Sequence, residues 1–252
     1  MAELKELTAE HHGDLRIAPD AVLNIAGNQH LFNLRATEIG KACSSFPVFI
    51  TRNPHNGDWA FSAMCGFEPG VNLFMRDSVW DAVYMPTAMQ TYPLFLMEAP
   101  NTEKGYAVGI DENAPAFSRE EGDPFFDDTG KATPMLTRMS GMLEADIRND
   151  TATRQFLARL DEMGLISAID LQVQYANGKV NTITGLNTVD EGKLNTFGGE
   201  TLEEFQKNGY LLAIHALLVS SFQLNAMIKR QGAGDEAVVG VKLEAAKDRT
   251  AA

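Results

Sequence analysis

Aromatic and charged residues gather near the expected ends of strands and helices in the first half of the chain. Five of them are candidates for one ligand pocket, and they are His55, Trp59, Arg76, Trp80 and Asp111. Tryptophan combines a large apolar ring with one hydrogen-bond donor, and the other three residue types add charge or polarity. Such a set suits a small molecule with apolar and polar parts. Core packing is the ordinary role of these aromatic residues, and it stays open as the alternative.

Motifs for catalysis and metal binding are weak or absent in the sequence. The stretch Asp128–Gly130 is DTG, the core of an aspartic-protease site, but that chemistry needs two such aspartates and the chain has a single copy. His55 and Asp58 form only a loose H-x-x-D, and no H-E-x-x-H, C-x-x-C or G-x-S-x-G occurs. We therefore expect no catalytic residue, no metal and no cofactor, and we favour a protein that is not an enzyme.

The stretch Cys65–Met75, CGFEPGVNLFM, has the glycine content of a phosphate-binding loop. Its glycines do not have the spacing of a dinucleotide-binding loop, and no G-K-[ST] follows. Glu68 would also repel a phosphate. We interpret the stretch as a tight turn in which Asn72 caps the chain and Leu73 and Phe74 pack into the core.

The composition is that of an ordinary globular protein, with 44% hydrophobic and 22% charged residues among 252. The net charge of -13 argues against a nucleic-acid partner, because such a partner needs a basic face. The first residues contain no apolar segment typical of a secretory signal, so we expect a cytoplasmic protein. Cys43 and Cys65 are expected to be reduced core thiols.

The longest apolar run, Gly209–Ile228, has the length of a membrane-spanning helix. It contains His215, Gln223 and Asn225, which favour a buried C-terminal helix and no membrane span. We expect His215 to be a packed core residue, since a single histidine within an apolar helix is seldom a catalyst.

Three segments have the alternating pattern of β-hairpins, and they cover residues 47–67, 93–111 and 165–186. The last contains Asn177-Gly178, the signal for a type I′ turn. Residues 76–86 are expected to form a short helix or helical turn. Thr133-Pro134 marks the start of a helix, and a second helix is expected from residue 149 to a stop at Gly164.

Together these elements predict an α+β fold. Its largely antiparallel sheet is built from three hairpins, with a helical stretch and a long C-terminal helix packed on it. Thr201 and Glu204 form an expected capping box before that last helix. We expect residues 1–14 to be a flexible N-terminal tail, residues 15–231 a single domain, and residues 232–252 a flexible C-terminal tail.

Several stretches, in this order, resemble the SapC family of bacterial proteins. They are FPVFITR, CGFEPGVNLFM, WDAVYMPTAMQTYPLFL, VGIDENAP, EGDPFFDDTGKATPML, ATRQFLARLDEMGLI, GLNTVDEGKLNTF and GYLLAIHALLVSSFQLNAMI. Each stretch alone is weak evidence, but the series extends from about Leu31 to Gln231 and is specific. The segment GFEPGVNLF looks like one of the characteristic segments of the family.

The family takes its name from a bacterial protein linked to the surface layer and its secretion. The resemblance implies a soluble accessory or binding protein in surface-layer or envelope protein export, or in nutrient uptake at the surface. It implies no catalytic residue. The alternative is a small-molecule sensor or an enzyme of unknown reaction, with a pocket between the sheet and the C-terminal helix. The partner would be an unknown protein or a small molecule, and the chain a monomer or a homodimer.

Overall fold

The computed structural model describes residues 4–53, 57–77, 79–100, 102 and 105–246. Backbone contacts divide the chain into two compact units. The first unit consists of Met1–Gly27 and Thr87–Arg148, and the second of Asn28–Pro86 and Asn149–Ala252. The sequence predicts a single domain over residues 15–231, and that range contributes residues to both units.

The first unit contains two small antiparallel sheets and three short helices. One sheet has the order β1-β9-β8, from β1 (Lys5–Glu6), β8 (Phe95–Glu98) and β9 (Tyr106–Ile110). The other has the order β10-β2-β11, from β2 (Arg16–Ile17), β10 (Phe117–Ser118) and β11 (Asp123–Pro124). The helices are α1 (Ala9–His12), α2 (Ala21–Gly27) and α4 (Thr87–Thr91). The predicted hairpin over residues 93–111 is the pair β8–β9.

The core of the first unit joins these elements to the start of α5 (Pro134–Glu162). Its buried members are Leu15, Leu94, Ile110, Phe125, Leu136, Met139 and Leu143. Residues near the N-terminus take part in the unit, although the sequence suggests a flexible tail over residues 1–14. Strand β1 pairs with β9, and the buried His12 accepts a hydrogen bond from the Thr8 amide at Nδ1 (3.1 Å) and faces Glu112 with Nε2 (3.0 Å).

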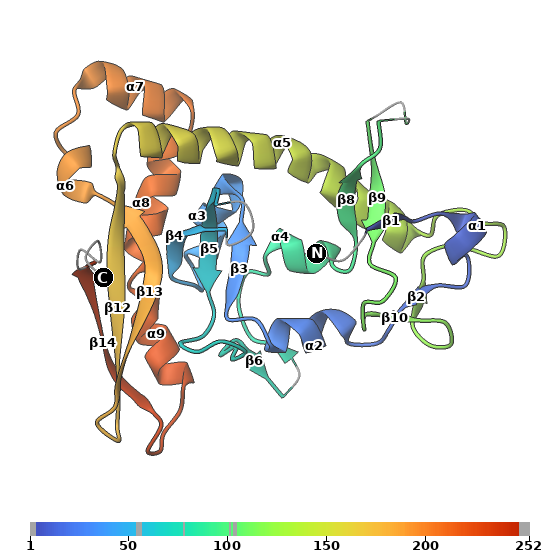
Figure 1. Ribbon diagram of the computed structural model, residues 1–252, viewed down its shortest axis with the longest axis horizontal. Coiled ribbons are helices and arrows are strands. Elements are labelled where there is room, and N and C mark those ends of the chain that lie inside the picture. Colours follow the sequence, from blue (N-terminus) through green and yellow to red (C-terminus); the bar gives the residue numbers. More distant parts are fainter. Residues whose placement is uncertain (1–3, 54–56, 78, 101, 103–104, 247–252) are drawn as a thin grey trace. The chain divides into compact units, whose positions relative to one another are not determined.

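The second unit is built on a six-stranded antiparallel sheet with the order β14-β12-β13-β4-β5-β3 (Figure 1). Its strands are β3 (Leu31–Leu34), β4 (Val48–Arg52), β5 (Trp59–Met64), β12 (Ile166–Tyr175), β13 (Val180–Val189) and β14 (Val238–Ala245). The other two predicted hairpins, β4–β5 and β12–β13, both form and lie side by side in this sheet. The α+β class and the antiparallel pairing are therefore confirmed.

Short helices accompany this sheet in the second unit. They are the 3-10 helix η1 (Ala36–Glu38), α3 (Ile39–Ala42), α6 (Glu191–Leu194), α7 (Gly199–Lys207), α8 (Tyr210–Ser220) and α9 (Gln223–Arg230). Helix α8 contacts β4 and β13, and α9 contacts β14, so the helix pair runs along one face of the sheet (Figure 1).

The longest helix lies in the middle of the chain and not at its C-terminal end, which corrects the prediction. Helix α5 has 29 residues and joins the two predicted helices without a break. The Thr133 hydroxyl accepts a hydrogen bond from the Leu136 amide (3.3 Å), and Gly164, with φ of +59°, follows its end. Both predicted ends of the helical stretch are correct, but no proline or glycine pair near residue 149 interrupts it.

The predicted long C-terminal helix is two helices, α8 and α9, bent by 40° relative to each other. The bend lies where serine side chains compete with the helix backbone. Ser220 Oγ and Ser221 Oγ donate to the carbonyls of Leu217 (2.6 Å) and Leu218 (2.8 Å), a pattern that bends helices. Among the described residues, no single helix is long and apolar enough to cross a membrane, whereas α8 and α9 together reach the required length and composition.

Three local predictions are wrong. Residues 76–86 do not form a helix but include the short hairpin of β6 (Met75–Arg76) and β7 (Val79–Trp80), and Asp77 between these strands has φ of +51°. Thr201 lies inside α7, whose N-cap is Gly198, so it forms no capping box. In the β12–β13 turn, Gly178 has φ of +84° but Asn177 has no positive φ. The turn is therefore not type I′.

Strand β14 occupies part of the segment expected to be a flexible C-terminal tail. It extends over eight residues, from Val238 to Ala245, and seven of them pair antiparallel with β12, with a bulge at Val239. The glycine-rich stretch before it suggests disorder in the sequence. Valines in the strand that follows pair with β12, which is far away in the sequence. The local sequence pattern therefore does not predict this strand.

Candidate functional site

The stretch Cys65–Met75 forms a tight turn, as predicted. The Leu73 amide returns to the Cys65 carbonyl (2.8 Å), and Asn72 Oδ1 accepts a hydrogen bond from the Phe74 amide (2.9 Å). A Cβ atom on Gly66 would lie 1.9 Å from the Val71 carbonyl oxygen, so only glycine fits there. Phe74 is fully buried, whereas Leu73 is only half-buried.

The same turn connects several parts of the second unit. The Phe74 ring packs against Phe46, with ring centroids 4.6 Å apart. The Arg230 guanidinium lies over the Phe74 ring at 4.5 Å and pairs with Asp81 (2.7 Å). At the other end of the turn, Glu68 accepts a hydrogen bond from the Tyr175 hydroxyl (2.8 Å). These contacts give the stretch a structural role.

The five candidate pocket residues are not brought together as one set. His55 lies outside the described residues, and Asp111 follows β9 in the first unit. Arg76 is an exposed residue of the β6–β7 hairpin. Trp80, in the same hairpin, packs its ring against Phe32, Phe46 and Phe74.

Trp59 and Trp80 lie near opposite ends of strand β5. Trp59 begins the strand, whereas Phe32, which contacts Trp80, pairs with Ala63. Four residues of an extended strand separate these ends by about 13 Å. Trp80 therefore has the core-packing role that was left open as the alternative, whereas Trp59 lies in a different environment.

Trp59 lines a small polar pocket of about 250 Å³. The Arg52 guanidinium lies 3.5 Å above the centre of its ring, and the buried indole Nε1 has no acceptor among the described residues. Asp150, on α5, pairs in the same pocket with Arg35 (2.6 Å) and with Arg154. The cationic groups therefore already have carboxylate or aromatic partners.

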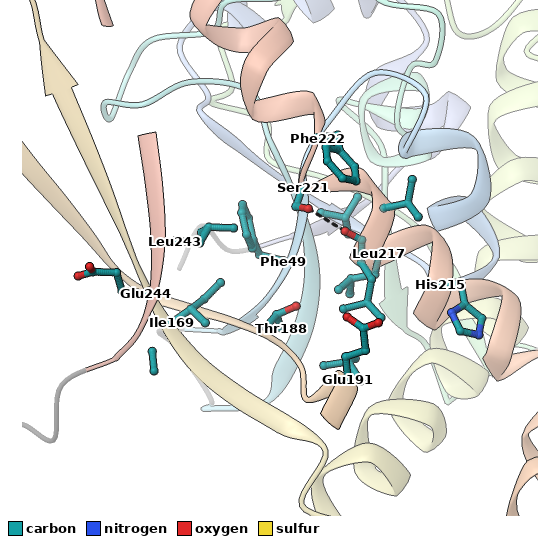
Figure 2. A pocket seen from close by; sticks show the side chains of 15 residues that line it. Phe49, Ile169, Thr188, Glu191, His215, Leu217, Ser221, Phe222, Leu243 and Glu244 are labelled. Atoms are coloured by element: carbon teal, nitrogen blue, oxygen red, sulfur yellow. Dashed lines mark hydrogen bonds between the residues drawn. The ribbon is translucent and has the colours of Figure 1, made fainter. Parts of the chain in front are cut away.

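A larger pocket, of about 550 Å³, lies between the six-stranded sheet and the helix pair α8–α9 (Figure 2). We call it the sheet–helix pocket. Its lining residues are Val48, Phe49, Ile169, Thr188, Val189, Glu191, His215, Leu217, Leu218, Val219, Ser221, Phe222, Leu243, Glu244 and Ala245. The position is the one predicted for a ligand pocket, but none of the five candidate residues lines it.

The interior of the sheet–helix pocket is apolar, and so is part of its rim. Phe49 and Leu217 are buried at its base. At the rim Val219, Phe222 and Leu243 are 59%, 73% and 38% exposed. Large apolar side chains seldom stay this exposed as a group without a partner.

Polar groups of the sheet–helix pocket are few and lie toward its edges. His215 is exposed, so the prediction of a packed core histidine is wrong. Glu191 begins the short helix α6, and the Glu244 carboxylate accepts a hydrogen bond from Gln172 (2.7 Å). Two carboxylates thus lie in the lining, which contains no lysine or arginine.

Neither metal nor thiol chemistry is indicated. No group of three histidine, cysteine or acidic residues in the described part of the chain is arranged to hold a metal ion. Cys43 and Cys65 are both free thiols, as predicted, but only Cys65 is a core residue, because Cys43 is half-buried. Burial raises the pKa of the Cys65 thiol well above its ordinary value, so it is a poor nucleophile.

Sequence reasoning missed the residues of the sheet–helix pocket for a physical reason. Helix α8 is apolar around its whole circumference, so its pattern does not show which side is buried. The outward side has Leu212, His215 and Val219 at helical spacing, and the histidine was the single visible signal.

Comparison with known protein families identifies one family that covers most of the chain. The chain matches the family described as SapC over residues 7–227, which is most of its length. Comparison with curated proteins and with solved structures found no match. The chain belongs to the SapC family.

Proposed function

We propose that this SapC-family chain is a non-enzymatic binding protein that holds an apolar segment of a partner polypeptide in the sheet–helix pocket. It would act in the cytoplasm as an accessory to surface-layer or envelope protein export, or to nutrient uptake at the cell surface. The observation that carries the proposal is the continuity between an apolar pocket and an exposed apolar rim.

The rim favours a polypeptide over a small molecule. A small-molecule site encloses most of its ligand, whereas here Phe222 and Val219 extend the apolar surface beyond the cavity. A peptide segment places one apolar side chain in a pocket and covers the surrounding rim with its neighbours. Burial of the rim would therefore require an occupant larger than the cavity.

The charge of the pocket indicates which kind of partner segment would fit. The lining contributes Glu191 and Glu244 and no lysine or arginine. Lys242 already pairs with Glu244 (2.5 Å), so the negative character comes from Glu191 and from the net charge of -13 of the whole chain. An apolar segment flanked by lysine or arginine is complementary to this surface. Segments with acidic flanks, and anionic lipid surfaces, are disfavoured by the same charges.

The test uses fluorescence anisotropy with three labelled nine-residue peptides. Two have the same leucine- and phenylalanine-containing centre, flanked by lysines or by glutamates, and the third has lysine flanks around a polar centre. We expect the first to bind about tenfold more tightly than the second, a difference of about 1.4 kcal/mol. Added salt should reduce this ratio. Equal binding of the polar-centre peptide would contradict the proposal.

Two variants connect binding to the pocket. Phe222→Asp and Val219→Asp place a charge on the apolar rim, so both should strongly weaken binding of the lysine-flanked peptide. Val180→Asp is the matched control, because Val180 is 55% exposed on β13 but does not line the pocket. If Val180→Asp weakens binding as much as Phe222→Asp, the peptide is held elsewhere.

A second candidate function is favoured by the cavity volume. About 550 Å³ lies within the range of small-molecule sites, which suits a sensor or an enzyme of unknown reaction. Native mass spectrometry of untagged protein, followed by the same sample denatured, separates the two candidates. A retained small molecule that Phe222→Asp releases would replace the peptide proposal.

A further inference from the structure

Strand β14 forms one edge of the six-stranded sheet. It is eight residues long and pairs on one side with β12. No strand in the described part of the chain pairs with its other side. An unprotected edge of this length is a template for another strand.

The register shows which backbone groups face the free side. The Ala246 amide donates to the Ala168 carbonyl (3.0 Å), and bonded positions alternate along an antiparallel pair. Glu244 and Lys242, opposite Asp170 and Gln172, therefore bond to β12. The amides and carbonyls of the residues between them, Val241, Leu243 and Ala245, point to the free edge.

The side chains of this edge are self-complementary under two-fold symmetry. If Leu243 lies opposite Leu243 of a second copy, antiparallel pairing places Lys242 opposite Glu244 of that copy, and Glu244 opposite its Lys242. Val241 then lies opposite Ala245. Lys242 and Glu244 already contact each other within one chain (2.5 Å), so both project from the same face of the strand. Opposite charges directly across a strand pair stabilise it.

We infer that a second copy of this chain pairs antiparallel along β14 in this register, giving a homodimer with one continuous sheet. The outward amides fit the same register, because Leu243 occupies a position that exchanges both hydrogen bonds with its counterpart. Backbone, charge and apolar side chains thus agree on a single alignment. A register shifted by two residues would place the two Lys242 or the two Glu244 side chains opposite each other.

The dimer would also complete the sheet–helix pocket on its β14 side. Leu243 and Ala245 line that pocket, and Leu243 is 38% exposed in the single chain. The second copy brings its own Leu243 to a Cα distance of about 5.5 Å. One wall of each pocket would then come from the partner.

Charge exchange tests the register. Wild-type protein should sediment as a dimer at micromolar concentration, whereas Lys242→Glu and Glu244→Lys should each weaken dimerisation at least about tenfold, because each places like charges opposite one another. An equimolar mixture of the two single variants should form heterodimers. The double variant Lys242→Glu/Glu244→Lys should restore the homodimer. A monomeric wild type at all concentrations, or a dimer insensitive to both single variants, would overturn the inference.

Hydrogen exchange gives a readout at single residues. The amides of Val241, Leu243 and Ala245 should be protected only in the dimer and exchange faster on dilution. Those of Lys242 and Glu244 should stay protected in both states because they bond to β12. Leu243→Pro removes an outward donor and no bond to β12, so it should give a folded monomer. A dimeric Leu243→Pro protein, or dilution-independent protection of the three outward amides, would also overturn the inference. None of these readouts depends on peptide binding.

Discussion

Arg159 on α5 donates two parallel hydrogen bonds to Glu204 on α7, from Nε to Oε1 (2.9 Å) and from Nη2 to Oε2 (2.8 Å). This two-point geometry is specific for a guanidinium and a carboxylate. The pair therefore holds α7 against α5. Helix α7 comes directly before α8, which lines the sheet–helix pocket. Glu204 was expected in a capping box, and its partner is instead 45 residues away.

The Arg159–Glu204 pair predicts a pH-dependent effect of Glu204→Gln. The hydrogen bond from Arg159 lowers the pKa of Glu204 below its ordinary value of 4.5. A lowered pKa means that the pair stabilises the folded state above that value and that this contribution disappears as the pH falls through the lowered pKa. Glu204→Gln should therefore lower the thermal unfolding midpoint at pH 7 and have less effect below pH ~4.

Glu203→Gln is the matched control for that measurement. Glu203 pairs with Lys207 on the solvent side of the same helix (2.6 Å), and both side chains are largely exposed. Exposed pairs of this kind contribute little. An equal loss of stability in both variants at pH 7 would show that the two-point geometry has no special role.

Gly66→Ala should strongly destabilise the fold. The added Cβ would overlap the Val71 carbonyl oxygen at 1.9 Å, so the turn would have to open. We expect a loss of about 2–4 kcal/mol in the free energy of unfolding, measured by urea denaturation. Gly40→Ala, in a helix with nothing within 4 Å of the added atom, should instead be neutral or stabilising by up to about 1 kcal/mol. Similar losses in both variants would contradict the role assigned to Gly66.

Ser220→Ala should cost more stability than Ser221→Ala. The buried Ser220 hydroxyl accepts a hydrogen bond from the Val48 amide (2.8 Å), and alanine would leave that donor unsatisfied in the core. The expected loss is about 1–3 kcal/mol. Ser221 bonds only within its own helix, to Leu218 (2.8 Å), so its loss should be within about 0.5 kcal/mol. The reverse order in chemical denaturation would refute this account of the α8–β4 contact.

The two cysteines should differ in reactivity toward an aromatic disulfide reagent. Cys43 is half-buried, whereas Cys65 is buried and its pKa is raised by burial. We expect Cys43 to react in the folded protein and Cys65 to react only after unfolding. Cys43→Ser should abolish the native reaction. A fast native reaction in Cys43→Ser would mean that the turn after β5 opens.

Local pattern was sufficient for the hairpins and for the ends of α5. The β12–β13 hairpin was predicted because its apolar residues alternate and a glycine marks the turn. Its turn type was missed because Asn177 does not adopt a left-handed conformation, and Asn-Gly also fits a three-residue loop with a bulge. The Tyr175 amide reaches the Lys179 carbonyl (2.9 Å), as that loop requires.

Long-range contacts were beyond the sequence. Nothing local separates Trp80, which packs in an aromatic cluster, from Trp59, which lines a polar pocket. The orientation of α8 depends on which side meets β4 and β13, so Val219 could not be recognised as exposed. The position of a pocket between sheet and helix followed from the fold class, but its residues did not.

The strand order has a consequence for synthesis on the ribosome. Ile50 on β4 meets its sheet neighbour Asn187 on β13 across 137 positions of chain. At ordinary translation speeds the β4–β5 hairpin therefore waits about 7–27 seconds with one unpaired edge exposed. Chaperones bind such nascent intermediates. The yield of folded protein should therefore depend more on the elongation rate than it does for a fold whose paired strands are neighbours in the sequence.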